Sequence, residues 1–208
     1  MLLPAEDING QTWTVQTIQP GGAKFFVTGS KKESNFHVVD SEYRGLAALD
    51  AVTAIVIAEG YATADTLSQA LSCPVVAAFD SGNLLKVAQV LQKKYPQKPI
   101  VIAGDDDLTQ ESINGKNPGK EKAMEAAQLV NGAVILPIFA PGEQMSQQLS
   151  DFNDLANKSV LGIEAVKRQV GSVVGKVSQQ AKQDSLLKLQ IPIEPKQQEI
   201  KQKRALVR

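Results

Sequence analysis

The stretches VTAIVIAEG (52–60), PVVAAFD (74–80) and PIVIAGDDD (99–107) decide the fold of this chain. Each contains a short, continuous apolar run rich in β-branched residues, which is typical of a strand buried on both faces. A fourth such run, AVILP, covers residues 133–137. Segments with helical spacing separate the runs, at residues 63–71, 83–95 and 118–130. This alternation predicts an α/β domain, with a roughly four-stranded parallel sheet and helices on both faces.

A small β-rich lobe is predicted before this domain. TWTVQTIQ (12–19) alternates as a half-buried strand does, PGGA follows as a turn, and KFFVTG (24–29) reads as a second strand. Another strand is expected at residues 35–39. The lobe should therefore be a short antiparallel hairpin or meander.

The C-terminal part is predicted to be helical at first. Residues 153–181 favour one or two helices, with a break near Gly171 or Gly175. The remainder is rich in Gln and Lys and contains two prolines, which favours a linker or an interaction tail from about residue 182. The predicted units are residues 1–50 (β-rich lobe), 51–160 (α/β domain) and 161–208 (helix and tail).

The composition excludes several classes of protein. At 208 residues, with 43% hydrophobic and 21% charged residues, the chain can bury a sizeable core. No apolar stretch approaches the roughly 20 residues of a membrane span, and the N-terminus does not resemble a secretory signal. The single cysteine, Cys73, excludes an internal disulfide framework and a multi-thiolate zinc site. We expect a cytoplasmic protein without membrane partners.

The net charge of zero hides an asymmetry along the chain. Residues 1–157 carry 11 basic and 18 acidic side chains, whereas residues 158–208 carry 11 and 4. An acidic core repels a phosphate polymer unless cations intervene, so some carboxylates are candidates to hold metal. A solvated acidic surface beside a basic linker explains the charges equally well.

Acidic residues follow three of the four predicted strands. Glu59 ends the first, Asp80 the second, and Asp105, Asp106 and Asp107 the third. Ligands of open parallel sheets bind at the carboxyl ends of the strands. In an extended segment Asp105 and Asp107 point to the same side, and Asp106 points away. We therefore expect Glu59, Asp105 and Asp107 to form an oxygen-rich site suited to Mg²⁺ or Mn²⁺. Asp80 could equally cap the next helix, and Asp106 could simply face water.

Two further groups are candidates near the same edge. Asp151 and Asp154, in SDFNDLA, could add outer contacts to a metal or cap a helix that begins near residue 153. Lys116 and Lys120 flank the start of the 118–130 helix, where lysines and a helix N-terminus favour phosphate. Lys120 is the better candidate for a triphosphate, although a solvated surface lysine is equally consistent.

Basic and aromatic residues occur together in the small lobe. Lys24, Lys31 and Lys32 accompany Phe25 and Phe26, a combination that can bind single-stranded DNA. At least one of the two phenylalanines should belong to the core.

The ordered motifs resemble a known family. They are EGYATA (59–64), FDSGN (79–83), IAGDDD (102–107), NPGKEKA (117–123) and DFNDLA (151–156). Together they resemble the Toprim-domain DNA primases of conjugative plasmids and satellite phages, and the stretch 10–39 resembles the small lobe that precedes Toprim in those proteins. The resemblance covers roughly residues 7–160.

The resemblance implies synthesis of RNA primers from NTPs on a single-stranded DNA template. Asp105 and Asp107 would be the main metal ligands, and Glu59 would share a metal or act as acid and base. Such primases commonly carry a zinc-binding module, which one Cys and one His cannot form, and no P-loop of a helicase occurs. We therefore expect a fragment of a larger primase, relaxase or primase-helicase. A Toprim nuclease or topoisomerase-like enzyme, or a non-catalytic DNA-binding module, remains as an alternative.

Overall fold

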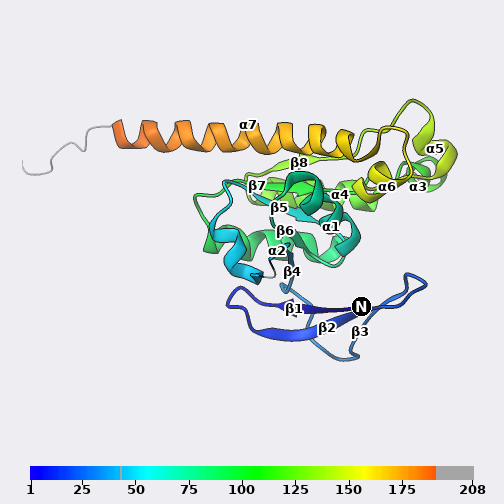
Figure 1. Cartoon of the computed structure of the whole chain (residues 1–208), viewed down its shortest axis with the longest axis horizontal. Helices are drawn as coiled ribbons and strands as arrows, with labels where there is room; N and C mark the ends of the chain where they lie inside the picture. The colour runs from blue at the N-terminus through cyan, green and yellow to red at the C-terminus, as the bar shows by residue number, and fades with distance from the viewer. Residues whose placement is uncertain (43, 191–208) are drawn as a thin grey trace, which may run out of the picture.

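The computed structural model describes residues 1–42 and 44–190, which form two sheets and their helices (Figure 1). The larger sheet has five strands in the order β4-β6-β5-β7-β8. Its strands are β4 (His37–Val39), β6 (Val75–Ala77), β5 (Ile55–Ala58), β7 (Ile100–Ala103) and β8 (Ala133–Ile135). The last four are parallel, as predicted, and β4 joins antiparallel to β6.

Strand β4 corrects one expectation, because the strand predicted at residues 35–39 for the small lobe belongs to the large sheet. Val38 packs into the core on one face of that sheet, and Val39 packs into the core on the other. Successive side chains of a strand point to opposite faces, so two adjacent buried valines require a sheet that is covered on both sides. The boundary near residue 50 stays a prediction.

Helices cover both faces of the large sheet, as predicted. One face packs against α2 (Ser81–Lys94) and α4 (Pro118–Leu129), through a core that includes Leu84, Val87 and Leu91. The other face packs against α1 (Tyr61–Leu71), α6 (Phe152–Asn157) and α7 (Gly162–Gln190). The short helices are η1 (Gly45–Asp50), α3 (Leu108–Asn114) and α5 (Glu143–Gln147).

The small sheet is antiparallel, with the order β1-β2-β3. Strands β2 (Thr12–Ile18) and β3 (Lys24–Phe26) follow the prediction, and β1 (Leu2–Glu6) was missed. Strand β1 contains Pro4 and lies at the edge, where a missing N–H is tolerated. Figure 1 shows this sheet on one side of the large sheet and α7 along the opposite side.

Helix α7 corrects two further expectations. It continues through Gly171 and Gly175, and it extends through residues 182–190, which we predicted to be a linker. A Cβ at Gly171 would lie 3.8 Å from Leu71 Cδ2, which is an ordinary van der Waals contact with α1. Residues 182–190 hold no Pro or Gly, and nothing in them stops the helix. The rest of the predicted tail, 191–208, lies outside the described residues. No helix in the described part is long and apolar enough to cross a membrane.

Candidate functional site

The carboxyl ends of β5 and β7 carry the predicted acidic residues. These two strands are parallel neighbours in the middle of the sheet, with Ala58 paired to Ala103. Glu59 directly follows Ala58, and Asp105 stands two residues beyond Ala103. The register therefore brings Glu59 and Asp105 to the same edge of the sheet, as the sequence indicated.

Asp105 is the most perturbed acid of this edge. Its Oδ1 atom is buried and has no hydrogen-bond partner. Burial, together with the negative charges of Glu59, Asp151, Asp107 and Asp154, raises the pKa of the Asp105 carboxyl to about 8. A buried carboxylate surrounded by four others requires either a proton or a cation to offset its charge.

Glu59 shares this environment. Burial raises the pKa of Glu59, and the charges of Asp107 and Asp80 act in the same direction. A backbone hydrogen bond from Ser81 and the charge of Lys24 oppose the rise. The side chain therefore lies between the carboxylates of the sheet edge and a cation that belongs to the small lobe.

Asn117 organises the loop that carries Asp106 and Asp107. Its Oδ1 accepts a hydrogen bond from the Asp107 N–H at 3.0 Å, and its Nδ2 donates to Asp106 Oδ1 at 2.7 Å and to Glu111 Oε2 at 2.9 Å. Gln144 Nε2 donates to Asp106 Oδ2 at 3.1 Å. Asp106 is thus held by the neutral amides of Asn117 and Gln144, and Asn117 also bonds Glu111 beside it.

Gly119 lets helix α4 approach this loop closely. The Gly119 N–H donates to Asp107 Oδ2 at 3.3 Å. A Cβ atom at this position would lie 2.9 Å from the Asp105 carbonyl oxygen and 3.1 Å from Asp107 Oδ2. The motif NPGKEKA therefore needs glycine here, because the backbone of the acidic loop occupies the space of a side chain.

Asp151 and Asp154 form a second acidic pair, at the start of α6. Asp151 Oδ1 caps the helix by accepting from the Asp154 N–H at 2.7 Å, and its Oδ2 accepts from Thr63 Oγ1 at 3.1 Å. Asp154 is buried, and it pairs with Lys158 at 2.7 Å. Capping is therefore one role of Asp151, while its charge also acts on Asp105.

The lysines of the small lobe separate into two groups. The Lys24 Nζ atom would lie 3.7 Å from a Cβ at Gly60, next to Glu59, and Lys32 forms an ion pair with Asp80. Lys31 instead lies over the ring of Trp13, at 4.9 Å from its centroid. Asp80 also caps α2 through the Asn83 N–H. Two of the three predicted DNA-binding lysines thus lie beside the acidic edge, the edge of the large sheet that carries Glu59, Asp80 and Asp105.

At the start of α4, Lys116 is exposed and Lys120 is half-buried. The Asn117 side chain caps this helix through the Lys120 N–H. Both lysines lie within three residues of Asn117, whose side chain accepts from the Asp107 N–H, and this is where we predicted a phosphate site.

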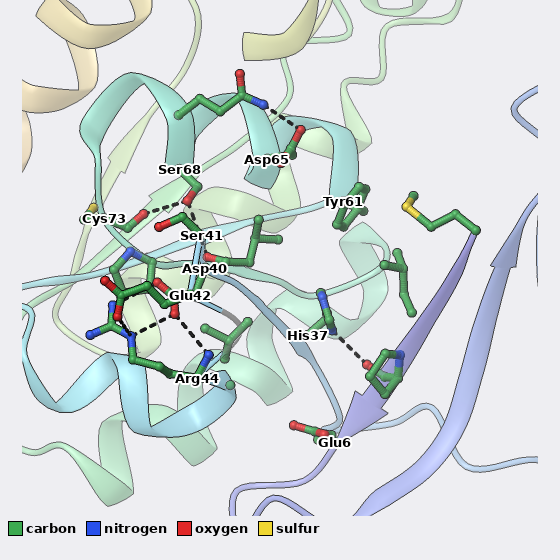
Figure 2. Close-up of a pocket in the computed structure, with 18 of the residues that line it drawn as sticks. Glu6, His37, Asp40, Ser41, Glu42, Arg44, Tyr61, Asp65, Ser68 and Cys73 are labelled. Atoms are coloured by element: carbon green, nitrogen blue, oxygen red, sulfur yellow. Dashed lines mark hydrogen bonds and ion pairs between the residues drawn. The ribbon is translucent and has the colours of Figure 1, made fainter.

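A cavity of about 780 Å³ opens beside this edge, between β1, β4 and α1 (Figure 2). None of the carboxylates that follow β5 or β7 lines it. In it, His37 bonds to the Pro4 carbonyl at 3.1 Å, and Arg44 pairs with Asp40. Burial lowers the pKa of His37. The cavity is thus distinct from the acidic edge.

Within residues 1–42 and 44–190, no three His, Cys, Asp or Glu side chains stand close enough together to hold a metal ion. Carboxylates that share an edge without a cation repel one another, so an ion would have to draw them inward. The unpartnered Asp105 Oδ1 and the hard oxygen donors around it suit Mg²⁺ or Mn²⁺. The residues therefore fit such an ion.

Sequence reasoning missed three buried polar residues near the acids, namely Thr63, Asn83 and Asn117. Thr63 and Asn117 bond acidic residues through their side chains, whereas Asn83 bonds Asp80 through its main-chain N–H. All three lie in the motifs EGYATA, FDSGN and NPGKEKA. A polar residue on the apolar face of a predicted helix was the signal available for Thr63.

The chain is similar to known proteins over most of its length. The family model described as Toprim domain matches residues 54–160. A DNA primase TraC of Escherichia coli is 42% identical over 231 aligned residues, which cover 84% of this chain and 21% of the relative. A second DNA primase TraC of Escherichia coli is 40% identical over 237 residues, which cover 87% and 16%.

The fold also resembles a solved structure, the primase fragment of the bacteriophage T7 primase-helicase protein. The TM-score is 0.52 at 16% identity, over 83% of this chain and 62% of that one. The chain spans about a fifth or less of the TraC relatives. The predicted parallel sheet, its flanking helices and the preceding β-rich lobe are confirmed. Since the family model covers half of a chain that also carries acids at the ends of β5 and β7, this chain belongs to the Toprim-domain family.

Proposed function

We propose that this chain is the catalytic core of a DNA primase, which joins ribonucleotides on a single-stranded DNA template in the cytoplasm. The observation that carries the proposal is the buried, unpartnered Oδ1 of Asp105 among four other carboxylates. The similarity to the two TraC primases supports it. The parent protein would supply further relaxase or helicase parts.

Asp105 and Asp107 would hold Mg²⁺ or Mn²⁺, with Glu59 beside them. When bound, such an ion would offset the charge of a triphosphate and lower the pKa of an attacking hydroxyl. Glu59 would share the ion, or it would hold a proton, since its raised pKa suits proton transfer. Asp151, fixed by Thr63, and Asp154 would orient water around the ion.

Lys24 and Lys32 would contact phosphates of the nucleic acid beside the acids. Register supports this placement, because Phe26 pairs with the buried Gln16, and Lys24 shares their face of the small sheet. That face is turned toward the large sheet, since Phe26 packs on Phe79 with 5.1 Å between the ring centroids. Cations on this face lower the repulsion that the acidic edge exerts on a template.

Lys31 would bind the strand on the opposite face of the small sheet. Phe25 pairs with Thr17, which lies on the same face of β2 as Trp13. Trp13 and Phe25 are both about half exposed, at 49% and 55%. Exposed aromatic rings with a nearby lysine can stack bases.

Lys116 and Lys120 would receive the triphosphate of the incoming nucleotide. They stand at the N-terminus of α4, a twelve-residue helix whose dipole favours anions at this end. The glycine at 119 brings this helix end against the acidic loop. An NTP could therefore reach both the lysines and the ion.

The test is incubation of the chain, and of a full-length relative that contains it, with single-stranded DNA, labelled NTPs and Mg²⁺ or Mn²⁺. We expect short RNA products that require template and metal, and none from the Asp105→Asn/Asp107→Asn double variant. Metal-dependent nicking without NTPs would show a strand-cleaving Toprim enzyme instead. DNA binding without either activity in both proteins would show a non-catalytic module.

A further inference from the structure

Asn83 connects the small lobe to the start of helix α2. Its side chain is 2% exposed and makes three hydrogen bonds. Nδ2 donates to the carbonyl oxygens of Asn35 at 2.9 Å and Ala78 at 2.8 Å, and Oδ1 accepts from the Ser34 N–H at 2.9 Å. The amide thus satisfies all of its donors and one acceptor position with main-chain groups.

Two of these bonds hold a loop that has little other regular structure. Residues 31–35 connect the small sheet to β4, and Ser34 has a φ of 64°. This left-handed conformation is uncommon for a residue with a side chain. It is supported by the bond from the Ser34 N–H to Asn83 and by a turn in which the Asn35 N–H donates to the Lys32 carbonyl at 3.0 Å. Asn35 Nδ2 donates in turn to the Lys31 carbonyl at 2.8 Å, which extends the support to the start of the loop.

The loop carries two of the lysines considered above. Lys32 reaches Asp80, the cap of α2, three residues before Asn83. Lys31 reaches the ring of Trp13. The position of both cations therefore depends on a loop whose backbone is bonded to Asn83.

We propose that Asn83 is a positioning residue. Through the loop at 31–35 it holds Lys32 beside the acidic edge and Lys31 over the ring of Trp13. Its main-chain N–H donates to Asp80 Oδ1 at 3.1 Å, while its side-chain amide bonds to main-chain groups. Its effect on the reaction is exerted through Lys32 and Lys31, and this part rests on the proposed primase function. The contact between Lys31 and Trp13 can be measured without any activity.

A purely structural role would predict something different. Loss of a buried amide would then lower stability and the amount of active protein, with an unchanged KM in the remainder. A positioning role predicts a raised KM for the template or NTP, because a displaced lysine weakens the binding of phosphate. Loss of one such contact amounts to about tenfold in KM, while kcat changes much less.

The experiment compares Asn83→Ala, Lys32→Gln and their combination with the wild-type chain, at a temperature where all are folded. Ser34→Pro is a second route to the same loop, since proline cannot adopt its φ and lacks the N–H. Gln92→Ala is the matched control, because this residue of α2 donates its side-chain amide to Val130 and lies away from the loop. We expect a raised KM for Asn83→Ala and Ser34→Pro, and an unchanged KM for Gln92→Ala.

The combined variant should be no worse than Lys31→Met/Lys32→Gln, because both remove the same two contacts. Trp13 is the single tryptophan, so its emission also reports on Lys31. We expect the emission to change in Asn83→Ala and Ser34→Pro, as it should in Lys31→Met, and not in Gln92→Ala.

Two results would overturn the positioning role. One is an unchanged Trp13 emission in both loop variants. The other is a KM for the combined variant that exceeds the KM of Lys31→Met/Lys32→Gln, or a loss confined to kcat. If the wild-type chain and its full-length relative make no primers, the proposed function fails, and the emission still decides whether Asn83 holds the loop.

Discussion

Replacing Asp105 with Asn should stabilise the metal-free chain at alkaline pH while it removes activity. The carboxyl has a buried, unpartnered oxygen and four acidic neighbours. Asn has nearly the same shape but no charge. The change therefore removes repulsion that only a proton or a bound cation otherwise offsets.

The size of the effect follows from the pKa. The folded chain raises the pKa of Asp105 from 3.8 to about 8, so between these values the folded state binds more protons than the unfolded state. The contribution of this proton to the free energy of unfolding is fully present below pH 3.8 and is lost as the pH rises through about 8. At about 1.4 kcal/mol per pKa unit, a rigid site would lose about 6 kcal/mol. Water entry and side-chain movement reduce this, and we expect about 2–4 kcal/mol.

Urea unfolding in EDTA measures the prediction, at about pH 5 and about pH 9, which lie on either side of the folded pKa. The wild-type chain should lose stability between the two, and Asp105→Asn should lose much less. Mg²⁺ should stabilise the wild type, because an ion that binds the folded state alone shifts the equilibrium, and it should not stabilise the variant. Asp106→Asn is the control, since Asn117 and Gln144 already bond that side chain.

The reasoning is refuted if Asp105→Asn is no more stable than the wild type at about pH 9. It is refuted equally if the two proteins lose the same stability between the two pH values. A similar gain from Asp106→Asn would show a general effect of surface charge.

Three further predictions concern the loop, the lysines and the last helix. Gly119→Ala should cost about 1–3 kcal/mol in urea unfolding and most of the primer yield, because the added Cβ meets the Asp105 carbonyl. Replacing Lys24, Lys31 and Lys32 with Ala should flatten the salt dependence of single-stranded DNA binding by roughly 2 units in a fluorescence titration. An unchanged slope would show that these lysines of the small lobe do not contact the strand. Deleting residues after 181 should leave the melting temperature nearly unchanged, since residues 182–187 are exposed, whereas deleting α7 from 162 should unfold the core that contains Val166 and Val170.

The order of elements and the chemistry of the acidic edge could be predicted from the sequence. Buried parallel strands leave continuous apolar runs, such as IVIA at 55–58 and 100–103, and these identify themselves without tertiary information. The acids that follow such runs must lie at one edge, because parallel strands end on the same side. Glu59 and Asp105 were therefore predictable as neighbours.

Other features depended on contacts between distant segments. We assigned strand β4 to the small lobe and the α7 residues 182–190 to a linker or tail. Both predictions were wrong, because a three-residue strand and a Gln- and Lys-rich helix have weak local signals. The ion pair of Lys32 with Asp80 and the bonds from Asn83 to the loop at 31–35 link residues about fifty positions apart, and the contact of Lys31 with Trp13 links residues 18 positions apart.

The sequence by itself thus determined the Toprim architecture and the place of Glu59 and Asp105 at one edge of the sheet, since periodicity and strand ends are local properties of the chain. Only the tertiary structure decided which lysines approach those acids and which amides hold them in place. Hydrogen bonds and charge interactions act over a few ångströms in space, and no spacing along the sequence records such distances.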